Sequence, residues 1–233
     1  MIPPTALVIP AAGLGTRMGQ RKALMALDDK PIIAHTLERF VPLANRFVAV
    51  VLVVHPDDAE GVESAIEGLR GQFASVVVVP GGARRQDSVR AGLEATPAAA
   101  ELVAIHDAAR PFVSARTVVA ALEAAAEVGA AIVATPMKPT VKRVEDGLVV
   151  ATLDREKLWC AQTPQVFRRE LLLAAWEAAE RDGLEVTDDA QLLEHIGHPV
   201  GIVPGSDVNL KLTTPEDLAL ARAMLAAGLV PAD

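Results

Sequence analysis

The sequence predicts an α/β protein of three layers, in which helices cover both faces of a mostly parallel central sheet. Short β-branched segments alternate along the chain with segments of helical periodicity, an order typical of repeated β-α units. The strand-like segments are continuous apolar runs, which are typical of strands buried on both faces. No linker, repeat or low-complexity tract divides the 233 residues, so we expect a single domain over residues 1–233.

Each element follows from a local pattern. Short apolar runs predict six strands, at residues 6–9, 47–54, 76–79, 102–105, 131–134 and 200–203. Helical spacing predicts four helices, at residues 31–40, 57–69, 86–95 and 114–128. Asp57 and Ser114 are the expected N-caps, and Gly71 and Gly129 the expected helix ends. Thr214, followed by Pro215, predicts the start of another helix.

One segment departs from this alternation and predicts a β-hairpin. Residues 140–144 and 148–153 are valine-rich and flank Asp146-Gly147, and Asp-Gly between two such runs is a strong hairpin signal. A hairpin that is also rich in Lys and Arg is not suited to a buried parallel sheet. We therefore expect an arm over about residues 138–158 that either extends into solvent or packs against another subunit.

The composition excludes several classes of protein. Hydrophobic residues make up 51% of the chain, enough for a sizeable core. The formal net charge of -8 argues against nucleic-acid binding, and no apolar run approaches the length of a membrane span. The single Cys160 excludes an internal disulfide and suits a reducing compartment. We expect a cytoplasmic protein with neither a nucleic acid nor a membrane as partner.

A loop of small residues after the first predicted strand indicates an anion site. After Ile9 the sequence reads Pro-Ala-Ala-Gly-Leu-Gly-Thr-Arg-Met, and Arg17 and Lys22 follow at the exit of the loop. Small side chains let backbone N–H groups approach an anion, and two cations suit a triphosphate. A Rossmann fingerprint needs glycine where Met18 stands, and a Walker P-loop needs Gly-Lys-Ser/Thr, so neither fits. A tight turn without a ligand is the plain alternative.

A second glycine-containing loop follows the predicted strand at residues 76–79. Ligands of open α/β sheets bind at the carboxyl ends of the strands. The backbone at Gly82 and Ala83, together with the Ser88 hydroxyl, is placed to read the hydrogen-bonding edge of a base. The alternative is a helix cap beside a solvated pair of arginines.

A third motif, His-Asp-Ala-Ala-Arg-Pro, follows the predicted strand at residues 102–105. Asp107 is placed to hold Mg²⁺, and Arg110 to bind a phosphate. We expect His106 to pack or form hydrogen bonds rather than act as a base, because a phosphate nucleophile needs no base. Lys211, on a short extended run, is expected to reach the same crevice, although a lone lysine is more often solvated.

The ordered set of motifs resembles one family, the 2-C-methyl-D-erythritol 4-phosphate cytidylyltransferases. The resemblance covers nearly the whole chain and extends to Thr140-Val-Lys-Arg143, Asp154-Arg155, Thr163-Pro-Gln165, Thr187-Asp-Asp-Ala190 and Asn209-Leu-Lys-Leu-Thr213. It implies a Rossmann-like nucleotidyltransferase fold with an inserted β-hairpin arm. It also implies an enzyme of the non-mevalonate isoprenoid pathway, which transfers CMP from CTP to methylerythritol phosphate and releases pyrophosphate.

The resemblance further implies a role for each matching residue. The catalytic residues would be Arg17, Lys22, Asp107 and Lys211. CTP would be bound by Ala11, Ala12, Gly13, Gly15, Gly82, Ala83, Arg85 and Ser88. The substrate would be bound by Asp107, Arg110, Lys211, Thr140 and Arg155, the last two from the arm of a partner in a homodimer. The implied cofactor is Mg²⁺ or another divalent cation, held by Asp107 or mainly by the phosphates.

The chain departs from the family pattern at two places. Arg21-Lys22-Ala23 stands where the family usually has Pro-Lys-Gln, and this bears on the placement of Lys22. Ala83 stands where the family often has an acidic residue, which implies that any base contact there is through the backbone. Two other functions stay open: a cytidylyltransferase for ribitol phosphate or another polyol phosphate, and a nucleotide-binding module without catalytic activity.

Overall fold

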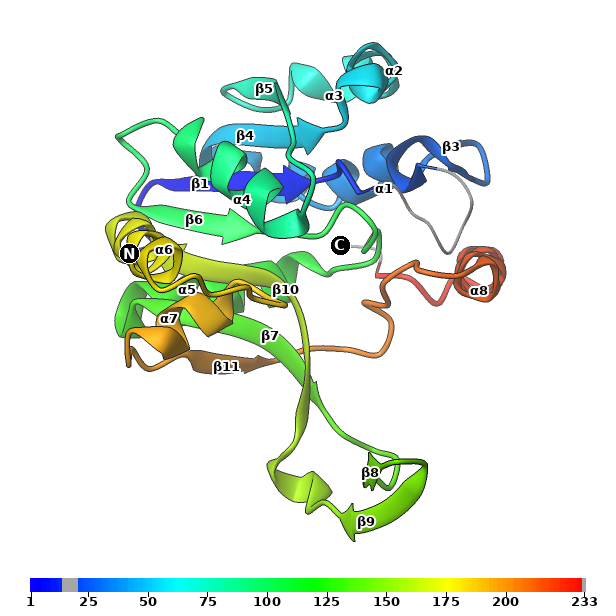
Figure 1. Cartoon of the computed structure of the whole chain (residues 1–233). Helices are drawn as coiled ribbons and strands as arrows, with labels where there is room; N and C mark the ends of the chain where they lie inside the picture. Colours follow the sequence, from blue (N-terminus) through cyan, green and yellow to red (C-terminus); the bar gives the residue numbers. More distant parts are fainter. Residues whose placement is uncertain (14–20, 232–233) are drawn as a thin grey trace.

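The computed structural model describes residues 1–13 and 21–231, and its centre is a seven-stranded sheet of order β11-β7-β10-β6-β1-β4-β5 (Figure 1). Neighbouring strands pair in parallel except β10, which is antiparallel to both β6 and β7. The predicted α/β class with a mostly parallel sheet is therefore confirmed. The strands are β1 (Thr5–Pro10), β4 (Phe47–Val54), β5 (Val76–Pro80), β6 (Leu102–Ile105), β7 (Ala130–Pro136), β10 (Trp159–Arg168) and β11 (Gly201–Pro204).

Helices cover both faces of this sheet and make the three layers. On one face α1 (Ile32–Glu38), α2 (Ala59–Ala65) and α5 (Ala115–Val128) share a core cluster with the strands. On the other face α4 (Arg85–Glu94), α6 (Arg169–Arg181) and α7 (Ala190–His195) share a second cluster. The short α3 (Glu67–Arg70) follows α2, and α8 (Pro215–Ala226) packs in a third cluster beside the hairpin of β2 (Ala26–Leu27) and β3 (Lys30–Pro31).

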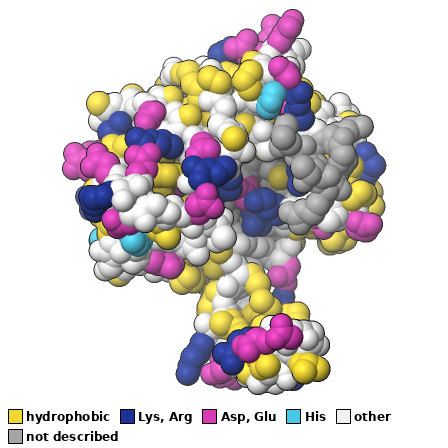
Figure 2. Space-filling model, in the orientation of Figure 1, with side chains coloured by type: hydrophobic (Ala, Val, Ile, Leu, Met, Phe, Trp, Pro, Cys, Tyr) yellow, Lys and Arg dark blue, Asp and Glu magenta, His cyan; other side chains and the backbone are white. Residues whose placement is uncertain are grey.

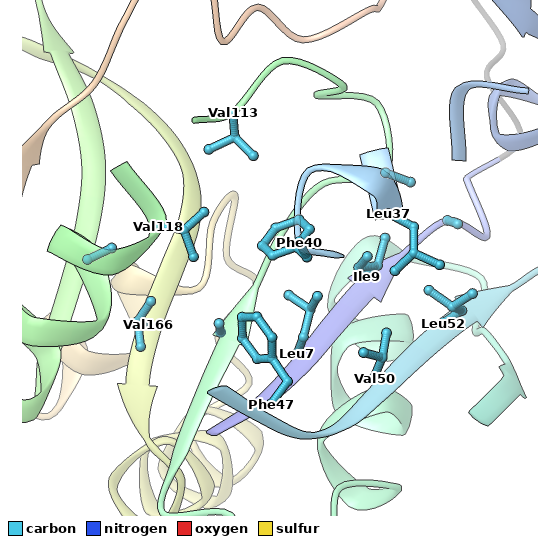
Figure 3. Close-up of a cluster of buried hydrophobic side chains, with 14 of the residues drawn as sticks. Leu7, Ile9, Leu37, Phe40, Phe47, Val50, Leu52, Val113, Val118 and Val166 are labelled. Carbon is cyan, nitrogen blue, oxygen red and sulfur yellow. The ribbon is translucent and has the colours of Figure 1, made fainter. Parts of the chain in front are cut away.

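The two core clusters explain why β1 is a continuous apolar run. Leu7 and Ile9 pack with Val50 and Leu52 on the α1 face (Figure 3), while Val8 belongs to the cluster on the α4 face. Successive side chains of a strand point to opposite faces, so a strand covered by helices on both sides needs apolar residues at every position. This burial suits the place of β1 inside the sheet, between β6 and β4.

All six predicted strands are present, but the sequence patterns did not include β10. This strand contains Gln162, Pro164 and Gln165 and therefore has no continuous apolar run. It enters the sheet between β6 and β7 as an antiparallel strand. The patterns also omitted α6 and α7, which follow β10 in the chain.

The predicted helix boundaries are confirmed in part. Ser114 caps α5 by accepting a hydrogen bond from the backbone N–H of Thr117 at 3.1 Å, and Gly129 ends that helix with a φ of 97°. Asp57 as an N-cap is wrong, because it lies inside a 3-10 turn at Pro56–Asp58 whose cap is His55. The carboxylate of Asp57 instead binds Arg21.

The predicted hairpin is also present, as β8 (Lys142–Glu145) paired with β9 (Leu148–Thr152). Asp146 and Gly147 between them have φ values of 49° and 79°, and two consecutive positive φ angles are what a type I′ hairpin turn requires. The arm leaves the sheet at the end of β7, returns into β10 and projects away from the body (Figure 1).

Within the described residues, no helix is both long and apolar enough to cross a bilayer.

Candidate active site

The loops after β1, β5 and β6 meet at the carboxyl edge of the sheet and line a hollow. Figure 2 shows basic side chains gathered in the depression at this part of the surface. Besides the backbone of these loops, the hollow is lined by Lys22 and Lys211 from other parts of the chain. The described lining residues are Pro10, Ala11, Ala12, Gly13, Lys22, Ala23, Ile32, Gly82, Ala83, Arg84, Arg85, Ser88, Asp107, Ala108, Ala109 and Lys211.

Small residues are necessary where the first two loops touch. A Cβ atom at Gly81 would lie 2.4 Å from Cβ of Ala12 and 2.8 Å from Oγ of Ser88. Ala11 donates a backbone hydrogen bond to the carbonyl of Val53 in the neighbouring strand. Gly81 donates likewise to the carbonyl of Val54 at 2.8 Å, so the loops after β1 and β5 are both tied to the end of β4 and together form one wall of the hollow.

The hydroxyl of Ser88 holds the second loop in shape. It accepts a hydrogen bond from the backbone N–H of Gly82 at 3.1 Å and lies 3.2 Å from the carbonyl oxygen of Arg84. Asp87 accepts from the backbone N–H of Arg84 and so closes the first turn of α4. Ser88 lines the hollow, and its contact with the base of a nucleotide stays a prediction.

The two arginines of this loop have different environments. Arg84 is half exposed and pairs with Asp87 and Glu185 at the rim of the site. Arg85 points inward and binds the buried carboxylate of Asp189. The alternative of a solvated arginine pair is therefore wrong for Arg85.

Asp107 lies at the centre of a group of cations. Its Oδ2 atom is 2.9 Å from Nζ of Lys211 and 3.4 Å from Nε of Arg110, and its Oδ1 atom is 3.5 Å from Nε of Arg85. Burial acts to raise the pKa of Asp107, but the three cations outweigh burial and hold that pKa well below its ordinary value. Asp107 is therefore a carboxylate at any physiological pH.

Lys211 reaches Asp107 because its neighbour is anchored in the core. Leu212 is fully buried against the α8 cluster, and its backbone N–H donates to the carbonyl of Ala109 at 2.8 Å. This bond ties the segment before α8 to the loop after β6. Lys211 therefore reaches the crevice, where its ammonium pairs with Asp107, while 39% of its side chain is exposed.

His106 is buried and holds the loop after β6 in place. The Thr163 hydroxyl accepts from the backbone N–H of Asp107 at 3.0 Å and lies 3.1 Å from Nδ1 of His106. The Nε2 atom is 3.0 Å from the carbonyl of Arg110, so a neutral ring protonated at Nε2 satisfies the network. Burial lowers the pKa of His106 to about 4. The predicted hydrogen-bonding role of His106 is confirmed.

Lys22, rather than its neighbour Arg21, faces the hollow. The guanidinium of Arg21 binds Asp57 and Asp58 at 2.8 Å each, on the side of α2. Nζ of Lys22 lies 3.4 Å from the carbonyl oxygen of Thr213, and its side chain lines the hollow. The unusual Arg21-Lys22-Ala23 sequence therefore still presents a lysine at this position.

A second hollow adjoins the first one on the side of β10. Arg85, Asp107 and Lys211 line both hollows. The second is completed by Arg110, Ala161, Gln162, Thr163, Gln165, Thr187 and Asp188. Sequence reasoning assigned no role to the residues from β10, because β10 itself was not predicted. The polar run Gln162-Thr163-Pro164-Gln165 inside a strand was the signal available.

Two of the predicted site residues are not described by the structure, and two others lie on the arm. Gly15 and Arg17 lie outside the described residues. Thr140 and Arg155 are not among the described residues that line either hollow. Both are exposed at the arm, where Nη1 of Arg155 donates to the carbonyl of Lys138 at 2.8 Å.

The side chains that line the first hollow suit a phosphate group better than a metal ion held by protein ligands alone. Within residues 1–13 and 21–231, no three His, Cys, Asp or Glu side chains cluster as metal ligands, and Asp107 is the one carboxylate that lines the first hollow. Mg²⁺ is commonly held by one or two carboxylates together with substrate phosphates. The residues present therefore fit a magnesium ion that is bound mainly through a nucleotide.

Comparison with known proteins agrees with this geometry. The sequence model for 2-C-methyl-D-erythritol 4-phosphate cytidylyltransferase matches residues 5–227. A protein of that name from Desulforamulus reducens is 46% identical over 223 residues, with 94% of each chain covered. The structure resembles that of the same-named protein from Thermus thermophilus, at 35% identity and a TM-score of 0.80, over 96% of this chain and 99% of the other. It also resembles the 4-diphosphocytidyl-2C-methyl-D-erythritol synthase of Anaerococcus prevotii, at 31% identity and a TM-score of 0.83, with the same coverage. The chain belongs to the 2-C-methyl-D-erythritol 4-phosphate cytidylyltransferase family.

Proposed function

We propose that this protein transfers CMP from CTP to 2-C-methyl-D-erythritol 4-phosphate, releasing pyrophosphate and forming 4-diphosphocytidyl-2-C-methyl-D-erythritol. One observation carries the proposal beyond family membership. Asp107, Arg85 and Lys211 line both hollows, so a nucleotide in the first and a polyol phosphate in the second would meet beside the same three side chains.

The first hollow suits CTP with its phosphates toward the loop after β1. Backbone at residues 11–13 and the ammonium of Lys22 supply donors and positive charge on that side. The opposite wall at Gly82, Ala83 and Ser88 is backbone-rich, which suits recognition of the edge of a base. Ala83 is exposed and carries no polar side-chain atom, so its contribution would come from the backbone.

The second hollow suits the phosphate of the acceptor. Arg110 has Nη1 2.8 Å from the carbonyl of Asn209, which holds the guanidinium beside Asp107. In the proposed reaction a phosphate oxygen of the acceptor attacks the α-phosphorus of CTP, and the bond to the bridging oxygen of the leaving pyrophosphate breaks. The nucleophile is already an anion, so no base is required. This agrees with a His106 ring whose two nitrogens both have partners inside the protein.

Catalysis in this scheme comes from position and charge. Lys211 and Arg85 flank the junction of the two hollows, where negative charge on two phosphates must approach. Asp107 binds both cations and so fixes where they lie. We propose that Mg²⁺ accompanies CTP, held by the phosphates and the Asp107 carboxylate. When bound, the ion would offset repulsion between the two anionic substrates.

The arm supports a homodimer in which the partner completes each site. Val144, Leu148 and Val149 on the arm are 53%, 71% and 62% exposed in the single chain. Such a cluster of apolar side chains is typical of a surface that a partner covers. Thr140 and Arg155 lie on the same arm, away from the two hollows of their own chain. We propose that they reach the hollow of the other subunit and contact the acceptor.

The exposed, unpaired thiol of Cys160 is consistent with a reducing compartment, and we propose the cytoplasm as the site of the reaction.

Release of pyrophosphate from CTP tests the proposed function. The purified protein is incubated with CTP and Mg²⁺, alone and then with methylerythritol phosphate or ribitol 5-phosphate. We expect release only when an acceptor is present, and a higher kcat/KM with methylerythritol phosphate. Faster reaction with ribitol phosphate would reassign the acceptor. No release with any acceptor would leave a nucleotide-binding module without activity.

A further inference from the structure

Asp189 is a fully buried carboxylate that the reaction scheme above does not use. Its two oxygens accept hydrogen bonds from Arg85, at 3.1 Å from Nη1 and 2.7 Å from Nη2. This is the two-pronged geometry in which arginine binds a carboxylate most specifically. Asp189 comes from the start of α7, whereas Arg85 comes from the start of α4, so the pair joins two helices on one face of the sheet.

Asp189 stands at the N-cap of α7 but does not cap it with its side chain. An aspartate at this position normally accepts a hydrogen bond from a backbone N–H of the first helical turn. Here the amide oxygen of Gln165 accepts from the backbone N–H groups of Asp189 and Ala190, at 3.0 and 3.2 Å. Gln165 is itself buried, and its amide nitrogen donates to Asp188. The backbone N–H of Gln191, in the first turn of α7, donates to Asp188 at 3.3 Å instead of to Asp189. Gln165 and Asp188 therefore serve the helix start, and the Asp189 carboxylate is available to Arg85.

The pairing decides which part of Arg85 faces the site. With Nη1 and Nη2 bound to Asp189, Nε is the guanidinium nitrogen that remains near Oδ1 of Asp107, at 3.5 Å. The other oxygen of Asp107 is then left to Lys211 and Arg110. If Asp189 lost its charge, the two-pronged edge of Arg85 would be free to turn onto Asp107 and compete with Lys211.

We propose that Asp189 is a positioning residue for the transfer reaction. It sets the orientation of Arg85 and thereby determines which cations lie beside each oxygen of Asp107. This inference rests on the proposed function. It also assigns Gln165 a supporting role, because its amide oxygen binds the backbone N–H groups of Asp189 and Ala190 and so holds the residue that carries the carboxylate. Burial raises the pKa of Asp189, and the charge of Arg85 opposes that effect.

A double-mutant cycle separates positioning from simple loss of structure. We expect Asp189→Asn to lower kcat for pyrophosphate release about tenfold or more, since groups in one network couple strongly. In an Arg85→Met background the same substitution should change kcat less than about twofold, because Asp189 then has no guanidinium to orient. Equal losses in the two backgrounds would overturn the proposal.

Two further variants guard against misfolding. Leu192→Ala removes a buried side chain from α7 without touching the carboxylate, and Leu192 is fully buried. If Leu192→Ala lowers the melting temperature as much as Asp189→Asn does, it should still keep a near-normal kcat. A loss of kcat equal to that of Asp189→Asn would show that the role of Asp189 is merely structural. If Asp189→Asn does not fold, Asp189→Glu keeps the charge but moves it, and the same cycle applies.

The NMR signal of the Arg85 Nε–H group tests the orientation without any turnover. We expect it to shift in Asp189→Asn but not in Leu192→Ala, and an unchanged signal in both variants would contradict the positioning role. Inactivity of the wild-type protein with every acceptor would refute the proposed function, while this signal would still decide whether Asp189 orients Arg85.

Discussion

The ammonium of Lys211 lies 2.9 Å from Oδ2 of Asp107 and links the segment before α8 to the loop after β6. Asp107 is 7% exposed, so its charge is poorly solvated and depends on its cationic neighbours. Lys211 is the strongest of the influences that lower the pKa of Asp107. The pair therefore keeps a carboxylate ionised where two substrates would meet, and the first prediction follows from it.

Asp107→Asn keeps the size of the side chain and removes its charge. We expect a loss of turnover of about 10²–10³-fold, because Lys211, Arg85 and Arg110 lose the group that positions them. The folded state should persist, with an unchanged circular dichroism spectrum. A Mg²⁺ titration then separates two roles: a raised Mg²⁺ requirement indicates a ligand, and an unchanged one indicates that Asp107 orients the cations. Full activity would contradict both roles.

Lys22→Ala removes a cation from the hollow without removing core contacts. We expect kcat to fall by about 10²–10³-fold, the usual cost of losing one preorganised charge at a reacting phosphate. Lys30→Ala is the matched control, because Lys30 binds Glu38 at 2.6 Å and does not line the hollow. Both variants should have melting temperatures close to that of the wild type. Near-normal turnover of Lys22→Ala would place Lys22 outside the site.

His106→Gln tests the buried imidazole through the pH dependence of stability. The pKa of His106 is lowered from 6.5 to about 4, so between these values the unfolded chain binds a proton that the folded protein does not. The contribution of His106 to the free energy of unfolding is therefore fully present above about pH 6.5. It is lost as the pH falls toward 4, by a total on the order of 3 kcal/mol.

The measurement is the urea-unfolding free energy of both proteins at several pH values from 4 to 7. Other acids titrate in the same range, so the difference between wild type and His106→Gln is the informative quantity. We expect the wild type to lose more stability on acidification than the variant. Parallel curves would show that His106 is not buried in its neutral form.

Mixing two inactive variants tests whether the arm completes the site of a partner. Lys22→Ala and Arg155→Ala are each expected to be inactive as homodimers. A mixed dimer would hold one site with both defects and one with neither, so random exchange should restore activity at about a quarter of all sites. If both residues serve the same chain, mixing restores nothing even when exchange of subunits is demonstrated by mass spectrometry.

Much of the fold was predictable because burial leaves a clear pattern. β4 and β6 were predicted to the residue, since strands covered on both faces must be apolar throughout. The arm was predictable because Asp146 and Gly147 suit a turn with positive φ angles. The carboxylate at Asp107 was recognisable because a single residue separates it from the end of a buried strand.

The remaining features depend on contacts between distant parts of the chain. β10 was missed because Gln162 and Gln165 point to partners in other segments, and these polar residues interrupt the apolar run. The ion pair of Asp189 with Arg85 joins the starts of α7 and α4, a contact with no local signature in the sequence. Asp57 looked like a helix cap because its local sequence suits one, but Arg21 binds its carboxylate.

Phosphorus NMR of the reaction mixture tests the central claim most directly, since it follows each phosphorus atom rather than a released product. The purified protein is incubated with CTP, methylerythritol phosphate and Mg²⁺. We expect the signals of CTP and of the acceptor monophosphate to be replaced by two coupled diphosphate signals and one pyrophosphate signal, which shows that the acceptor phosphate now bonds to the former α-phosphorus. Formation of CMP and pyrophosphate with the acceptor unchanged, or no consumption of CTP, would contradict the account.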